Sequence, residues 1–175
     1  MRNEKVLFVT RAAMIAAVYV VLTYLSAEFS LASGSVQLRL SEALCVLPYF
    51  TPAAIPGLFV GCLAANLLTG AVIWDVIFGS LATLIGAVGT YYLRKHRFLC
   101  TLPPVISNTV IIPAVLILAY HIPAIRFLGA NITYWFTAFT VGLGEIIMIC
   151  VVGYTFLRVL ERYRSYIFDR SGAVQ

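Results

Sequence analysis

A few polar side chains interrupt the long apolar runs of this sequence, and they are the residues most able to do chemistry. Glu145 lies in the middle of one apolar run, next to Gly142 and Gly144, which we expect to leave room for a flat ring. An ionisable group at such a position is costly in a membrane and usually functional. The other candidates come from separate segments of the chain: Gln37, Arg39, Glu42, Asn66, Asp75 and Asn108. In a helical bundle most of these fall at similar depth, so we expect them to face one pocket that binds a small polar molecule.

Each candidate also has a purely structural interpretation. Arg39 and Glu42 are three residues apart, and they can simply pair with each other at an interface. Asp75 can be an ordinary residue of a helix N-terminus beside Trp74, and Asn108 can join two helices by a hydrogen bond. Glu145 is the hardest to explain in this way, because a carboxylate in the middle of a span needs a partner.

Motifs of catalysis and of metal binding are missing from the sequence. It has no GxxxxGK[ST] motif for ATP, no HExxH and no GxSxG. The four cysteines form no CxxC pair, and we expect them to be small buried residues rather than disulfides or metal ligands. We therefore expect neither an enzyme nor a cofactor or metal site, and nothing indicates nucleic-acid binding.

The composition is that of a membrane protein. Hydrophobic residues make up 62% of the 175 residues and charged residues 11%, whereas soluble domains are about half apolar and a quarter charged. No soluble fold of this length could bury so much apolar surface. Six spans of about 20 residues take up most of the chain, which leaves short loops and no room for a soluble catalytic domain.

The apolar runs predict an all-α integral membrane protein, a compact bundle of six transmembrane helices in one domain, 1–175. Thr51-Pro52 ends one run, Pro56 opens the next, and Pro103-Pro104 suits a helix start. The predicted helices cover residues 6–26, 40–51, 54–70, 71–93, 102–121 and 134–160.

Lysines and arginines predict the orientation. With six spans and a cytoplasmic N-terminus, only Arg39 and Arg126 fall outside. The remaining basic residues fall inside, as the positive-inside rule requires: Arg2, Lys5, Arg11, Arg94, Lys95, Arg97, Arg158, Arg162, Arg164 and Arg170. We expect a multi-pass protein of the cell membrane with both termini cytoplasmic.

Small residues mark one face of the first helix. Ala12, Ala13, Ala16 and Ala17 form two interleaved small-xxx-small pairs, a spacing that lets two helices approach closely in lipid. These pairs either pack the bundle internally or dock another membrane protein.

The sequence resembles the substrate-binding S components of energy-coupling factor (ECF) transporters, and within them the QueT family. The stretches that carry this resemblance are Val36–Leu44, Phe50–Gly61, Asp75–Leu84 and Leu102–Asn108, together with the alanine face. The resemblance implies a subunit that binds a queuosine precursor, queuine or a related 7-deazaguanine. It also implies that the alanines meet a membrane-embedded T component, which two cytoplasmic ATPase subunits drive.

A 7-deazaguanine fits the candidate residues chemically. Glu145 or Glu42 can accept hydrogen bonds from its N1–H and 2-amino groups. Asn66 or Asn108 can donate to O6, and Asp75 can meet a cationic aminomethyl group. Two other functions stay open: an S component for another vitamin-like substrate, and a stand-alone transporter that uses Glu145 as a proton relay. A third possibility, a membrane enzyme or assembly factor, is the least favoured, because the sequence shows no set of catalytic residues.

The predicted topology can be tested by cysteine-accessibility labelling. We expect cysteines placed at Ser33 and Ser171 to label from opposite sides of the membrane, because one lies in an outer loop and the other in the basic tail. Labelling of both positions from the same side would contradict the six-helix arrangement.

Overall fold

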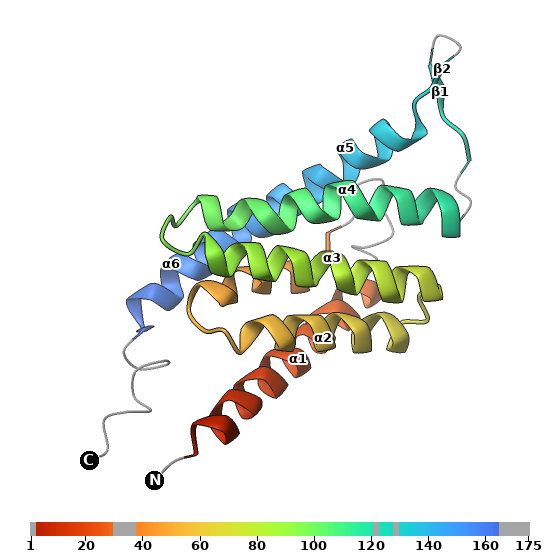
Figure 1. Ribbon diagram of the computed structural model, residues 1–175. Coiled ribbons are helices and arrows are strands. Elements are labelled where there is room, and N and C mark those ends of the chain that lie inside the picture. Colours follow the sequence, from red (N-terminus) through yellow and green to blue (C-terminus); the bar gives the residue numbers. More distant parts are fainter. Residues whose placement is uncertain (1–2, 30–37, 121–122, 128–129, 165–175) are drawn as a thin grey trace.

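The computed structural model describes residues 3–29, 38–120, 123–127 and 130–164, and its chain is almost entirely helical (Figure 1). The bounds of every predicted helix lie within two residues of those observed. In chain order the elements are α1 (Glu4–Glu28), η1 (Leu40–Tyr49), α2 (Ala54–Leu68), α3 (Ile73–Tyr92), η2 (Leu99–Thr101), α4 (Leu102–Ala119), β1 (Arg126–Phe127), β2 (Ala130–Asn131), α5 (Thr133–Glu145), η3 (Ile146–Gly153) and α6 (Tyr154–Arg162).

One small feature departs from the all-α prediction. The strands β1 and β2 form a two-stranded antiparallel hairpin, in which Arg126 pairs with Asn131 and Phe127 with Ala130. The hairpin lies beyond the helical bundle, at the end opposite the start of α1 (Figure 1).

Four helical segments in the described part of the chain are long and apolar enough to cross a membrane. They are α1, α3, the segment Leu99–Ala119, and the segment Thr133–Arg162 that joins α5, η3 and α6. The other two predicted spans are shorter, at 10 residues for η1 and 15 for α2. The 15 residues of α2 reach about 22 Å at 1.5 Å per residue, against a hydrocarbon core of about 30 Å. The protein is thus an all-α membrane protein, and six crossings stay a prediction.

The short helix η1 is the central element. It is a 3₁₀ helix, and its eight residues from Ser41 to Pro48 are all buried. It contacts α1, α2, α3, η3 and α6. A 3₁₀ helix rises about 2 Å per residue, so ten residues extend about 20 Å rather than the 15 Å of an α-helix. Irregular backbone of this kind is tolerated at membrane depth where protein surrounds it.

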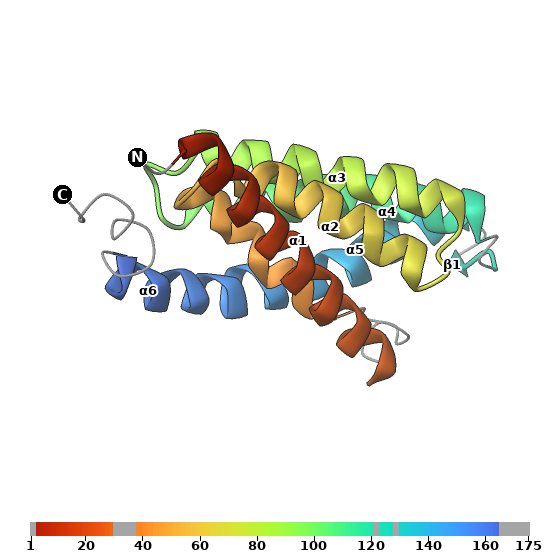
Figure 2. The same cartoon turned by 90° about the horizontal axis from the view of Figure 1, so that it is seen from below.

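Small residues bring the outer helices close together. A Cβ atom at Gly57 would lie 2.8 Å from the backbone oxygen of Ala12, and one at Gly61 would lie 3.0 Å from the Cα of Ala16. The helix α1 therefore crosses α2 with almost no side chain between the two backbones. Figure 2 shows this crossing from below. Likewise, a Cβ atom at Gly86 in α3 would lie 2.6 Å from the Cα of Pro104 in α4.

The start of α1 and the end of α6 lie at the same end of the bundle (Figures 1 and 2), and these helix ends carry basic residues, among them Lys5, Arg158 and Arg162. Glu161 of α6 accepts a hydrogen bond from the hydroxyl of Tyr49 at 3.2 Å, and it lies 3.1 Å from Nε of Arg97. Arg158 approaches the same carboxylate at 3.8 Å. These contacts tie the end of η1 to α6 and to the turn after α3. The orientation of the chain in the membrane stays a prediction. Ser33 and Ser171, the two positions chosen for labelling, lie outside the described residues.

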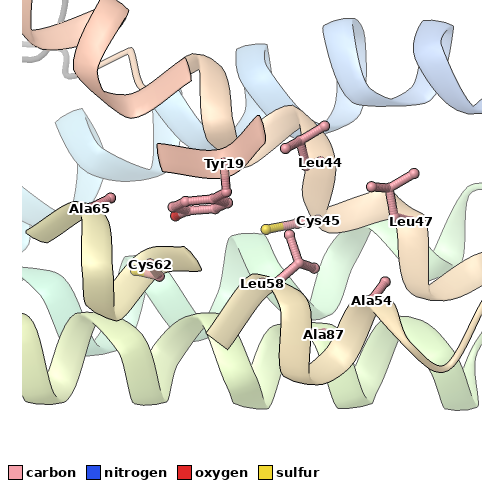
Figure 3. Packing of buried hydrophobic residues seen from close by; sticks show 9 residues of the cluster. All are labelled: Tyr19, Leu44, Cys45, Leu47, Ala54, Leu58, Cys62, Ala65 and Ala87. Carbon is pink, nitrogen blue, oxygen red and sulfur yellow. The ribbon is translucent and has the colours of Figure 1, made fainter. Parts of the chain in front are cut away.

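Polar contacts on the inner face of α1 hold it against η1. Tyr19, Thr23 and Ser26 are the buried residues of α1, and their spacing places them on one face. The hydroxyl of Tyr19 donates to Oε1 of Glu42 at 2.7 Å, and that of Thr23 donates to Oγ of Ser41 at 2.8 Å. The backbone N–H of Leu40 donates to Oγ of Ser26 at 2.9 Å. Figure 3 shows the ring of Tyr19 between Cys62 and Ala65 of α2 and Cys45 of η1.

Replacement of Tyr19 by Phe tests this contact. The variant keeps the packed ring but leaves Oε1 of Glu42 without its donor, so we expect it to be less stable by about 1–3 kcal/mol. Thermal unfolding in detergent measures the change. The control is Tyr120→Phe, because Tyr120 is 41% exposed and water can replace its contact. A melting temperature equal to that of the wild type in Tyr19→Phe would show that the bond contributes nothing.

Candidate functional site

Four of the predicted site residues meet around one small cavity at the centre of the bundle. Its volume is about 20 Å³, and its lining comes from η1 with the residue before it and from α2, α3, α4 and α5. The lining residues are Arg39, Glu42, Cys62, Gly79, Thr83, Asn108, Ile112, Val141 and Glu145. Sequence segments that are far apart thus bring Arg39, Glu42, Asn108 and Glu145 to one place, as their depth predicted.

Both carboxylate oxygens of Glu42 accept hydrogen bonds from the protein. Glu42 is 3% exposed, and Tyr19 donates to its Oε1. Its Oε2 accepts from Nδ2 of Asn108 at 3.3 Å and from Sγ of Cys45 at 3.2 Å. Three donors from three elements fix the position of this carboxylate, so Glu42 has little capacity left to bind anything else.

Glu145 is only partly satisfied. It is the last residue of α5, and the π-helical stretch η3 begins directly after it. Its Oε2 is buried and has no hydrogen-bond partner in the described structure. An unpaired buried carboxylate oxygen costs free energy, and π-helical turns often occur at functional sites. Both features indicate that Oε2 is available to a ligand.

Gly142, three residues before Glu145, has a different role from the expected one. The sequence suggested that Gly142 and Gly144 leave room for a flat ring. A Cβ atom at Gly142 would instead lie 3.1 Å from Oγ1 of Thr109 in α4. Gly142 therefore allows α5 to pack against α4, and it is Val141 that lines the cavity.

Asp75 lies next to the cavity, behind Gly79. It is 4% exposed, whereas its neighbour Trp74 is 54% exposed, so Asp75 is not an ordinary surface residue of a helix N-terminus. Its Oδ2 lies 3.7 Å from Nη2 of Arg39 and accepts from the hydroxyl of Tyr120 at 3.3 Å. Its Oδ1 is buried and has no hydrogen-bond partner among the described residues. The ion pair of Arg39 is thus with Asp75, not with Glu42 as the sequence spacing allowed.

Asn66 supports this part of the site rather than lining the cavity. Its Nδ2 donates to the backbone oxygen of Asp75 at 3.3 Å and approaches Sγ of Cys62 at 3.7 Å. It joins α2 to the start of α3, which is the structural role considered for asparagines of this kind. The remaining candidate, Gln37, lies outside the described residues.

Carboxyl groups outnumber cationic groups around the cavity. Glu42, Asp75 and Glu145 supply three carboxyl groups, and Arg39 supplies one guanidinium. In a medium of low dielectric constant such an imbalance is costly. The site therefore favours a ligand that brings hydrogen-bond donors, a positive charge, or a proton.

Several residues around the site were missed from the sequence. Tyr19, Cys45 and Tyr120 all contribute hydrogen bonds to its carboxylates. A tyrosine in the middle of an apolar helix was a usable signal, because its hydroxyl needs a partner when it is buried. Cysteine gives no such signal. All four cysteines are free thiols. Three are buried, as predicted, whereas Cys150 is only half-buried, and Cys45 also donates to Glu42.

A larger hollow of the described structure lies elsewhere. It is a groove of about 660 Å³ between α3 and α4. Its lining residues are Trp74, Phe78, Val110, Ile111, Ala114, Val115, Leu118 and Ala119. Several of them are largely exposed, such as Leu118 at 74%. The indole of Trp74 is the one polar side-chain group in this lining, so the groove is suited to apolar contact and not to recognition of a polar molecule.

The alanine face of α1 divides into two halves. Ala12 and Ala16 lie against Gly57 and Gly61 of α2. Ala13 and Ala17 are exposed on the outside of the bundle. The structure therefore assigns internal packing to one pair and leaves the other pair free for contact with another helix.

Known proteins that resemble the chain point to transport. The family described as QueT transporter matches residues 9–162. A curated relative from Lactococcus lactis subsp. cremoris (strain MG1363), named Queuosine precursor transporter QueT, is 33% identical over 85 residues. That match covers 49% of this chain and 50% of the relative, so the chain spans about half the length of the relative it matches. No solved structure gives a significant match. Since the family match extends over most of the chain and agrees with the resemblance seen in its sequence, this protein belongs to the QueT transporter family.

Proposed function

We propose that this chain is the substrate-binding subunit of an ECF-type importer and takes up a queuosine precursor, queuine or a related 7-deazaguanine. The observation that carries the proposal is the buried polar cavity, with an unpartnered carboxylate oxygen on Glu145 at its lining and another on Asp75 beside it. Membership of the family and the printed name of the Lactococcus relative support the choice of substrate.

The edge of a 7-deazaguanine base complements the free groups of the site. Its N1–H and 2-amino groups are adjacent donors, and Oε2 of Glu145 is an acceptor without a partner. Its O6 is an acceptor, and Arg39 lines the cavity with a guanidinium group that carries five N–H donors. Glu42 serves mainly to orient Asn108, because its own oxygens already accept three hydrogen bonds.

Binding of such a base requires the site to open. A cavity of about 20 Å³ holds roughly one water molecule, and a bicyclic base is several times larger. Two segments that depart from α-helical geometry begin beside the cavity: η1 starts at Leu40, two residues before Glu42, and η3 starts at Ile146, directly after Glu145. We infer that the lining moves apart there when the base enters.

The chain needs an external source of energy in this proposal, because its sequence has no P-loop for ATP. A membrane-embedded T component and two cytoplasmic ATPase subunits supply it. Ala13 and Ala17 provide the surface on α1 that a helix of the T component can approach closely.

A stand-alone proton-coupled transporter is the second candidate, and one observation favours it. The buried, unpartnered Oε2 of Glu145 is also what a proton relay needs. Co-purification distinguishes the two functions. An S component brings ATPase subunits with it, whereas a stand-alone transporter does not. A binding titration against queuine and its precursors tests the substrate and separates it from other vitamin-like molecules.

The contact between Glu145 and the base is tested by Glu145→Gln. The variant keeps the size of the side chain but presents one N–H group to the donor edge of the base. Loss of a charge-assisted hydrogen bond costs about 1.5–3 kcal/mol, so we expect the dissociation constant to rise roughly 10- to 150-fold. Isothermal titration with purified protein measures it.

A thermal melt separates binding from folding, and Glu161→Gln is the matched control. It makes the same substitution at the basic end of the bundle, away from the cavity. Near-native affinity in a folded Glu145→Gln protein would exclude Glu145 as the acceptor of the base.

Docking is tested by Ala13→Trp combined with Ala17→Trp. Both positions are exposed, so the indoles obstruct a partner helix without disturbing the bundle. If the contact is worth about 1.4 kcal/mol, uptake falls about tenfold. Ligand binding by the isolated subunit persists.

The matched control is Ala12→Trp with Ala16→Trp, which places the indoles against Gly57 and Gly61. We expect this pair to lower the melting temperature and to abolish binding. Equal loss of binding and uptake in the Ala13 and Ala17 variant would mean that the outer face is structural too.

A further inference from the structure

One carboxylate oxygen of Asp75 has no hydrogen-bond partner in the part of the chain that the structure describes. Oδ2 is engaged by Arg39 and Tyr120, but Oδ1 is buried without a partner, on a residue that is 4% exposed. A structural aspartate in a low-dielectric site normally satisfies both oxygens. An oxygen left in this state points to a group that is supplied from outside the chain.

The residue packed against this oxygen is Gly79, one turn further along α3. A Cβ atom there would lie 3.1 Å from Oδ1 of Asp75 and 3.3 Å from Nδ2 of Asn66. Gly79 also lines the cavity that contains Glu145. A ligand whose ring occupies an enlarged cavity can therefore extend a substituent past Gly79 to Oδ1.

The charge of the site decides which substituent is favoured. Three carboxyl groups face one guanidinium, so an ammonium group reduces the imbalance and a neutral substituent does not. The other two carboxylates are less suitable for it. The oxygens of Glu42 already accept from Tyr19, Cys45 and Asn108, and Glu145 is the acceptor for the donor edge of the base in the proposed function.

We propose that Asp75 is a specificity-determining residue that receives a cationic amine on the substituent of the base through Oδ1. The protein then prefers amine-bearing 7-deazaguanines to neutral ones with the same guanine edge. This inference rests on the proposed function. It adds to the proposed function the substituent on the base, which the family match does not specify.

The test is a pair of titrations on the purified full chain. 7-Aminomethyl-7-deazaguanine carries an ammonium group at neutral pH, and 7-cyano-7-deazaguanine is neutral with the same hydrogen-bonding edge. We expect the wild type to bind the aminomethyl base about 10- to 100-fold more tightly, the size of a charge-assisted contact. In Asp75→Asn this ratio falls toward one, mainly because the aminomethyl base binds more weakly.

A second variant reaches the same contact by a different route. Gly79→Ala leaves the carboxylate in place but puts a methyl group about 3.1 Å from Oδ1, where it obstructs a substituent of the ligand. We expect the ratio to fall in this variant too, so the test does not depend on how well Asp75→Asn folds after Arg39 loses its partner. Ser80→Ala is the control on the same helix. The hydroxyl of Ser80 is bonded to the backbone oxygen of Val76, and we expect the wild-type ratio.

The outcomes separate this inference from the proposed function. If the wild type binds both bases and the ratio is unchanged in folded Asp75→Asn and Gly79→Ala proteins, Asp75 does not recognise the charge. A wild type that prefers the cyano base contradicts the inference directly. If the wild type binds neither base, the proposed function fails, and this assignment fails with it.

Discussion

The buried carboxylate of Glu42 is the constraint on which the rest of this structure depends. A carboxylate placed deep in an apolar bundle must be given hydrogen-bond donors. Here the donors come from three elements: Tyr19 of α1, Cys45 of η1 and Asn108 of α4. Satisfying one side chain therefore fixes three helices relative to one another, and it does so at the position where the candidate ligand cavity lies.

The central position of η1 follows from the same constraint. Its first residues face the cavity, and its last residue, Tyr49, bonds to Glu161 at the basic end of the bundle. A 3₁₀ helix covers this distance with fewer residues than an α-helix does. One short buried helix thus joins the candidate binding site to the basic end, and a shift of η1 would change the contacts at both places.

The three carboxylates of the site differ in how much of their hydrogen-bonding capacity the protein uses. Both oxygens of Glu42 are engaged, whereas Asp75 and Glu145 each keep a buried oxygen without a partner in the described structure. This difference separates a residue that builds the site from residues that are available to a ligand. It also accounts for how a site can be well ordered and still electrostatically incomplete, which is what selective binding of a donor-rich or cationic molecule requires.

Hydropathy alone determined where the helices lie, because long apolar runs bounded by proline and by charges leave little choice of span. The polar residues that interrupt those runs were visible in the same way, since each is costly in lipid and needs a reason to be there. Which face each residue takes was decided only by the tertiary structure. In a membrane the inside and the outside of a bundle are both apolar, so no periodicity distinguishes the packed Ala12 and Ala16 from the exposed Ala13 and Ala17. The sequence also did not show which carboxylate pairs with Arg39. Arg39 pairs with Asp75 and not with the nearby Glu42, because the fold brings α3 close to Arg39 while three other donors already bond to Glu42.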